Sequence, residues 1–165
     1  MSNCLYFICP TDHLETVIEQ SFNQAHYFYT SLGNSVVLNP ETVGQINELV
    51  ASKNIKQITF LLSRNNGIIQ AALKNEKCVD IKGLCSFYHF INNHLGNLNF
   101  NQRIEDVELQ LISNYLNKKV NEFSSMLNKS LMDDISINGS IYYPHDKVFI
   151  EAVPALFQFN RFYLN

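Results

Sequence analysis

The chain has 165 residues, an apolar content of 46% and a net charge of -3 at pH 7. This length suits one domain with its own core, so we expect a single domain over residues 1–165. The weak negative charge gives no electrostatic basis for nucleic-acid binding, and no segment has the pattern of a membrane span or a signal peptide. The four cysteines show no paired spacing, which indicates reduced thiols and a cytoplasmic location.

The first half of the chain predicts three strands, each followed by a helix. Short apolar runs predict strands at residues 5–9, 26–30 and 58–62. Apolar residues at helical spacing predict helices at residues 14–22, from Asn39-Pro40 onward and at 67–74. Asp12 stands where the N-cap of the first of these helices is expected, and we prefer this role to one as a catalytic acid or base.

The second half predicts two helices and then a hairpin. The helices are expected at residues 84–95 and 104–127, and the hairpin strands at 135–143 and 147–152, joined by the turn Tyr143–Asp146. Alternating strands and helices are typical of parallel crossovers. The fold class we expect is therefore α/β, with a central, mostly parallel sheet flanked by helices on both faces.

Polar loops follow the three predicted parallel strands. These loops are Cys9–His13, Thr30–Asn34 and Ser63–Gly67. The carboxyl ends of parallel strands meet at one edge of a sheet, and ligands bind there where the strand order reverses. The three loops together are the candidate site.

These loops resemble the beta-class carbonic anhydrases in their order and spacing. Here they read "FICPTDHLE", "YTSLGNSV" and "FLLSRNNGIIQAAL", against the family's Cys-x-Asp-x-Arg, Arg-Asn-Ala-Gly-Asn and His-x-x-Cys-Gly. The later segment "DDISINGSIYYPHDKVFIE" resembles the closing strand pair of that family. The resemblance covers nearly the whole chain, apart from the family's N-terminal helical arm, and implies an antiparallel strand at the sheet edge.

The resemblance also implies that the zinc chemistry of the family is missing. Cys9 falls on the first thiolate ligand, but Ser63 falls on the histidine ligand and Asn66 on the second thiolate. Neutral serine and asparagine oxygens do not replace an imidazole and a thiolate on zinc. The vestigial pocket implied by the resemblance comprises Cys9, Asp12, His13, Gly33, Asn34, Ser63, Asn66 and Gly67. In this set we expect the glycines to serve tight turns or close backbone approach.

We therefore expect a catalytically inactive protein without zinc or another cofactor, acting as a binding or regulatory homodimer. The aromatic segment Pro154–Tyr163 is a candidate dimer contact. One alternative is a hydrolase or acyl-transfer enzyme that reuses the pocket with Cys9, Asp12, His13 and Ser63. Another is a pocket rebuilt for a different metal around Cys9 and His13. Cys9 also fits a role as a small buried residue.

The loop after the third strand is a candidate anion site. It precedes a helix, whose free N–H groups and dipole favour negative charge. The expected anion-binding residues are Arg64, Asn65, Asn66 and Gly67, with Arg64 as the cation if its side chain turns inward.

Overall fold

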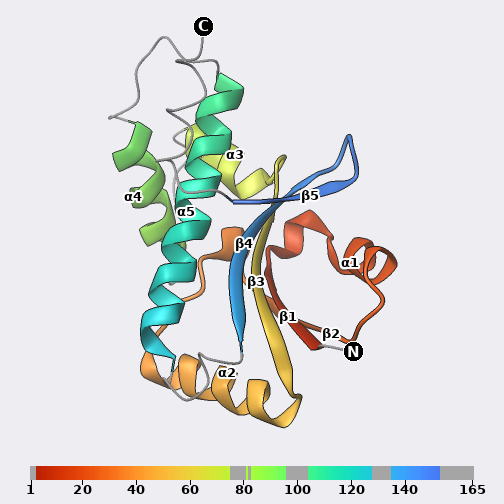
Figure 1. The fold of residues 1–165 in the computed structure, drawn as a ribbon. Helices are drawn as coiled ribbons and strands as arrows, with labels where there is room; N and C mark the ends of the chain where they lie inside the picture. Colours follow the sequence, from red (N-terminus) through yellow and green to blue (C-terminus); the bar gives the residue numbers. More distant parts are fainter. Residues whose placement is uncertain (1–2, 75–80, 82, 96–103, 128–134, 153–165) are drawn as a thin grey trace, which may run out of the picture.

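A five-stranded sheet organises the computed structural model, which describes residues 3–74, 81, 83–95, 104–127 and 135–152 (Figure 1). The strands are β1 (Asn3–Ile8), β2 (His26–Thr30), β3 (Ile55–Ser63), β4 (Ser136–Tyr143) and β5 (Val148–Glu151). The helices are α1 (Glu15–Ser21), α2 (Pro40–Ser52), α3 (Gly67–Leu73), α4 (Leu84–Leu95) and α5 (Ile104–Met126), with short 3-10 turns η1 (Pro10–Asp12) and η2 (Leu32–Asn34). The candidate dimer segment Pro154–Tyr163 lies outside the described residues.

The strand order is β2-β1-β3-β4-β5. The first three neighbouring pairs are parallel, and β4 and β5 form an antiparallel pair at the edge. The predicted fold class is confirmed, including the antiparallel edge strand. β3 is buried over Ile58–Ser63, because neighbouring strands pair on both of its sides and side chains cover both faces.

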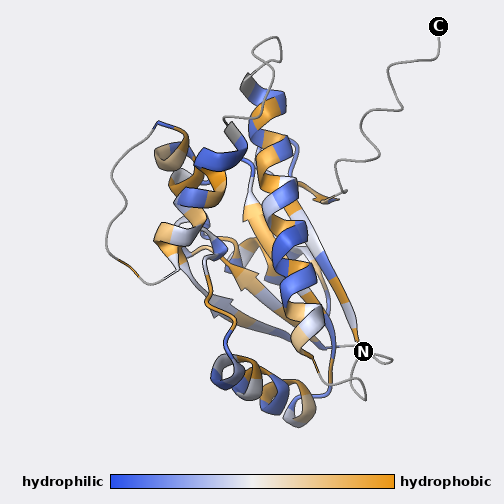
Figure 2. Ribbon diagram, turned by 90° about the vertical axis from the view of Figure 1, so that its left-hand side faces the viewer, coloured by the Kyte–Doolittle hydropathy of each residue, from blue (hydrophilic) through white to orange (hydrophobic). Residues whose placement is uncertain are grey.

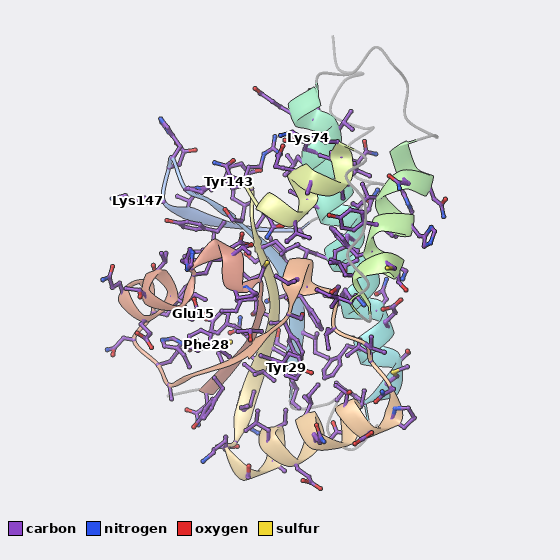
Figure 3. All side chains as sticks on the ribbon, turned by 180° about the vertical axis from the view of Figure 1, so that it is seen from behind. Glu15, Phe28, Tyr29, Lys74, Tyr143 and Lys147 are labelled. Atoms are coloured by element: carbon purple, nitrogen blue, oxygen red, sulfur yellow. The ribbon has the colours of Figure 1, made fainter. Side chains whose placement is uncertain are left out.

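Alternate side chains along the strands pack into two separate hydrophobic cores, one on each face of the sheet. On one face, Leu5 and Phe7 of β1 join a large cluster with residues of α2, α3, α4 and α5. On the other face, Tyr6 joins a smaller cluster under α1. Figure 3 shows the same alternation in β2, where Phe28 and Tyr29 point to opposite sides of the sheet. The helices therefore flank both faces, but unequally.

Stacked aromatic rings fill the centre of the larger cluster. The rings of Phe7 and Phe60, on neighbouring strands, lie 4.4 Å apart between centroids, and Phe123 of α5 packs against both. Figure 2 shows apolar and polar residues along the whole of α5, as expected for a helix with one buried side. None of the helices in the described ranges is long and apolar enough to cross a membrane.

Candidate functional site

The predicted loops meet at the point where the strand order reverses, between β1 and β3. From there the chain order runs outward to β2 on one side and to β4 on the other. Hydrogen bonds join six of the eight predicted pocket residues into connected groups: Cys9 with Gly33, Asp12 with Ser63 and Asn66, and Asn34 with both central strands. The structure therefore brings most of the predicted residues together at this edge of the sheet, and their role as a binding site stays a prediction.

Asp12 connects the loop after β1 to the loop after β3. Its Oδ2 accepts the backbone N–H of Ser63 and its Oδ1 accepts the side-chain amide of Asn66, both at 2.8 Å. Burial raises the pKa of Asp12 to about 6, although these two hydrogen bonds favour the ionised form. The prediction that Asp12 caps α1 is wrong, because the N-cap of that helix is Leu14 and no side chain caps it.

Asn66 uses both ends of its side-chain amide. It is fully buried; its Oδ1 accepts the N–H of Ile69 at 3.0 Å and so caps α3, while its Nδ2 donates to Asp12. The neighbouring Ser63 is 6% exposed and accepts the N–H of Asn65 on its hydroxyl at 3.3 Å. Both residues are therefore engaged in holding the two loops in place.

Cys9 is fully buried at the end of β1. Its Sγ accepts the N–H of Gly33 at 3.1 Å and lies 3.0 Å from the hydroxyl of Thr11. Gly33 has a φ of +57°, and a Cβ there would lie 3.1 Å from the Ile68 side chain, so this position favours glycine as predicted. The same prediction is wrong for Gly67, where a Cβ would meet nothing within 4 Å.

Asn34 ties the two central strands together. Its side chain is fully buried, and Nδ2 donates to the carbonyls of Phe7 at 3.0 Å and Leu61 at 2.9 Å. Its own carbonyl accepts the hydroxyl of Tyr115 on α5 at 3.0 Å. These bonds join β1, β3 and α5 beneath the loops.

No hydrogen bond connects His13 to the buried groups in the part of the chain that the structure describes, although its charge acts on the neighbouring Asp12. His13 is exposed and has a φ of +52°, whereas Cys9 is buried and contacts Thr11. Asp12 reaches Ser63 through the backbone N–H and not through the hydroxyl. The contacts of the described residues therefore give the hydrolase alternative no nucleophile paired with a base, and they give no support to a metal held by Cys9 and His13.

Arg64 does not turn toward the pocket. Its Nη1 lies 3.3 Å from Oε2 of Glu108 on α5, and both side chains are 15% exposed. Its backbone N–H donates to the carbonyl of Tyr142 on β4. The condition that Arg64 turns inward is therefore not met in this structure, and the small-anion site at Arg64, Asn65, Asn66 and Gly67 stays a prediction.

The donor set does not fit zinc. A zinc site needs three or four thiolate, imidazole or carboxylate ligands, and the site offers the Cys9 thiol and an Asp12 carboxylate whose oxygens both accept hydrogen bonds. Within the described ranges, no group of three or more histidine, cysteine, aspartate or glutamate residues is placed to hold a metal ion.

The sheet and helices closely match those of solved carbonic anhydrases. A cysteine-to-alanine mutant of the beta-carbonic anhydrase CafD from Aspergillus fumigatus superposes with a TM-score of 0.73 at 13% identity, over 93% of this chain and 90% of that one. The chain has the beta-carbonic anhydrase fold.

Two other fungal enzymes support this assignment. CafA of Aspergillus fumigatus gives a TM-score of 0.70 at 18% identity, over 94% of this chain and 78% of that one. A tetrameric beta-carbonic anhydrase of Sordaria macrospora gives 0.69 at 17% identity, over 91% and 80%. No protein-family model matches the chain, and no curated protein matches it. At these identities the likeness to the beta-carbonic anhydrases establishes the fold.

Some contacts that hold the site in this beta-carbonic anhydrase fold could not be predicted from the sequence. Glu108 and Tyr115 of α5 hold Arg64 and Asn34 from a distance of more than forty residues along the chain, and no local pattern indicates such pairs. Lys119 did leave a signal. It interrupts the apolar stripe Ile112, Leu116 and Phe123 of α5, so it stands where a buried residue is expected.

Proposed function

We propose that this chain is a beta-carbonic-anhydrase-fold protein that does not use zinc, does not hydrate carbon dioxide, and acts as a binding or regulatory protein. One observation carries the proposal. At the positions that the resemblance assigns to zinc ligands, Ser63 and Asn66 are hydrogen-bonded to Asp12. These groups serve the loops, and none of them is a second thiolate or an imidazole.

The surroundings of the cysteine support the same proposal. The Cys9 sulfur accepts a backbone N–H from Gly33 and contacts Thr11, so it is already part of the hydrogen bonding of the site. A single thiol without an imidazole partner gives zinc too few strong donors, because structural and catalytic zinc sites take three or four protein ligands.

The experiment measures zinc and activity in the purified full-length chain. We expect well under one zinc per chain by elemental analysis after growth with added zinc, and no carbon dioxide hydration above the buffer rate in stopped flow. One zinc per chain, or measurable hydration, would overturn the proposal.

A restored ligand set tests whether the positions are assigned correctly. We expect the double variant Ser63→His/Asn66→Cys to bind about one zinc per chain together with Cys9, because it then has three strong donors. Adding Cys9→Ser to the double variant should remove the zinc, and circular dichroism confirms that each variant is folded. A folded double variant without zinc would contradict the assignment of Ser63 and Asn66 to ligand positions.

We further propose that the protein is a homodimer. Val148 and Ile150 of the edge strand β5 are 42% and 47% exposed, and the outer edge of β5 has no neighbouring strand in the sheet that the structure describes. An apolar edge strand is prone to pair with another chain. The Sordaria macrospora relative in fold is described as tetrameric.

Sedimentation velocity at micromolar concentration tests the dimer. We expect a dimer for the native protein and a monomer for Ile150→Lys, which puts a charge on the proposed contact. Ile81→Lys, at another exposed apolar residue, is the control and should leave the dimer intact. A native protein that sediments as a monomer would disprove this part of the proposal.

A further inference from the structure

A cavity lies on the helical side of the sheet, and Asp12 is not part of its lining. It has a volume of about 330 Å³ and is bounded by the segment between η2 and α2, the start of α4, and α5. Figure 1 shows α4 and α5 side by side at this face of the molecule. Its apolar lining includes Val36, Phe87, Tyr115 and Met126. This volume is at the lower end for small-molecule sites, so the cavity suits a small ligand.

The cavity wall contains a buried lysine. Lys119 of α5 is 9% exposed, and its Nζ donates to the carbonyl of Val36 at 3.0 Å and lies 3.3 Å from Oε2 of Glu122. The Nζ also lies 5.7 Å from the centre of the Tyr115 ring. An ammonium carries three N–H donors, and these contacts use two of them. The third N–H remains for a ligand.

The charges along this wall are unequal. Glu122 shares its carboxylate between two lysines, with Oε1 2.6 Å from Lys118 and Oε2 3.3 Å from Lys119. Burial lowers the pKa of Lys119, and Glu122 opposes that change. Among the described residues of this wall, two ammonium groups therefore face one carboxylate beside an apolar cavity, where water compensates charge poorly. The wall is complementary to one further negative charge.

We propose that this cavity binds a small monocarboxylate with an apolar body. The carboxylate accepts the third N–H of Lys119, and the apolar body lies against Phe87 and Met126. A carboxylate fits better than a phosphate, because phosphate sites combine several donors or an arginine fork, whereas the described lining has one buried ammonium. The proposal concerns a site separate from Asp12, so it does not depend on the proposed function.

Benzoate and benzamide form a matched pair of probes, since they share the ring and differ in charge. Each is titrated into the full-length protein carrying carbon-13 methionine methyl groups, while the Met126 methyl is observed by NMR. We expect benzoate to bind about ten- to hundredfold more tightly than benzamide, because a hydrogen bond to a charged group is worth more than a neutral one. Benzoate should also show a nuclear Overhauser effect to the Met126 methyl, which identifies the cavity directly.

Two lysine variants separate the buried ammonium from general charge. Lys119→Met removes the proposed partner and should abolish the preference for benzoate. Lys53→Met removes the same charge at an exposed side chain at the end of α2, outside the cavity lining, and should change benzoate affinity by less than about threefold. If Lys119→Met does not fold, the native protein decides the question through the benzoate–benzamide ratio and the Met126 contact.

The proposal would be overturned by the absence of a Met126 shift with benzoate, by equal affinity for benzamide, or by an unchanged preference in folded Lys119→Met. Tighter binding of inorganic phosphate than of benzoate at the same methyl would also overturn it, because the site would then select the charge of the anion and not a carboxylate with an apolar body.

Discussion

The half-buried Asp12 carboxylate should make the stability of this protein depend on pH. Its pKa is about 6 in the folded chain, because burial disfavours the charge, and 3.8 is the ordinary value. Between about pH 4 and pH 6 the folded state therefore binds more protons than the unfolded state. It follows that Asp12 stabilises the fold fully below about pH 4 relative to higher pH, and that this contribution is lost as pH rises through 6.

The expected size follows from the same values. A pKa difference of about two units corresponds to about 3 kcal/mol, and partial solvent contact of Asp12 reduces this to about 2–3 kcal/mol. This effect opposes the hydrogen bonds from Ser63 and Asn66, which favour the ionised form.

Urea denaturation of the wild type and Asp12→Asn at half-unit steps from pH 4 to pH 8 measures this contribution. The free energy of unfolding of the wild type should fall by about 2–3 kcal/mol relative to the variant over this interval. Glu48→Gln, which removes an exposed carboxylate on α2, is the control and should run parallel to the wild type. The carbon-13 shift of the Asp12 carboxyl should titrate with a midpoint near 6.

The opposite slope would refute the reasoning. If the wild type gains stability over Asp12→Asn as pH rises, the bonds from Ser63 and Asn66 outweigh burial, and the pKa of Asp12 lies below its ordinary value. Parallel curves for the two proteins would mean that burial and hydrogen bonding cancel.

Three further predictions concern stability and are checked by urea denaturation at pH 7. Gly83→Ala should lower the free energy of unfolding by at least about 2 kcal/mol, because φ is +91° and a Cβ would lie 2.1 Å from the Ser35 carbonyl oxygen. Gly44→Ala is the control: a Cβ there meets nothing within 4 Å, so the substitution should stabilise α2 by about 0.5–1 kcal/mol. Equal effects of the two substitutions would contradict the close approach at Gly83. Asn34→Ala should lower the free energy of unfolding by about 2–3 kcal/mol, because it leaves the buried carbonyls of Phe7 and Leu61 without their donor. A loss no larger than that caused by Asn121→Ala, at an exposed asparagine, would show that the Asn34 bridge contributes little. Phe60→Ala should cost about 3–5 kcal/mol through the cavity left beside Phe7, compared with about 1 kcal/mol or less for Phe22→Ala at a ring 37% exposed; similar losses would mean that the core closes around the gap.

Most of the fold was predictable because its signals are local. Apolar runs and helical spacing located every strand and helix of the described residues to within a few positions, as with α2 at Pro40–Ser52 after its predicted cap Asn39. Alternation of strands and helices then leaves few topologies. The reversal of strand order between β1 and β3 placed the candidate site, since loops at that point must meet.

The role of Asp12 was not predictable in the same way. Its position before α1 suggests a cap, yet its partners Ser63 and Asn66 are 51 and 54 residues away. Sequence spacing indicates which N–H groups lie near Asp12 along the chain. It does not indicate that the loop after β3 brings Ser63 and Asn66 next to Asp12 in the folded protein. Arg64 and its partner Glu108 illustrate the same limit, because the helix that supplies Glu108 begins forty residues later.

Lys119 shows a signal that sequence reasoning can use. A lysine at a buried position of an amphipathic helix is costly unless it has partners, so it indicates a carbonyl or carboxylate nearby. The carbonyl of Val36 and the carboxylate of Glu122 supply these partners. The partner Glu122 could be predicted from the sequence, because it follows Lys119 at i+3 on the same helix. The partner Val36 could not, because it lies 83 residues earlier in the chain and only the fold brings it close.

The side chain of Asn34 has a consequence for how the protein is made in the cell. Its amide fastens Phe7 of β1 to Leu61 of β3 beneath the loops, with groups that the chain carries itself. Proteins whose loops are held by a metal reach their final shape only after the ion has been delivered, and chelators unfold many of them. A frame closed by a neutral amide is complete once translation and folding are finished. The bridge between β1 and β3 therefore forms in the same step as the sheet itself, without the later delivery of an ion.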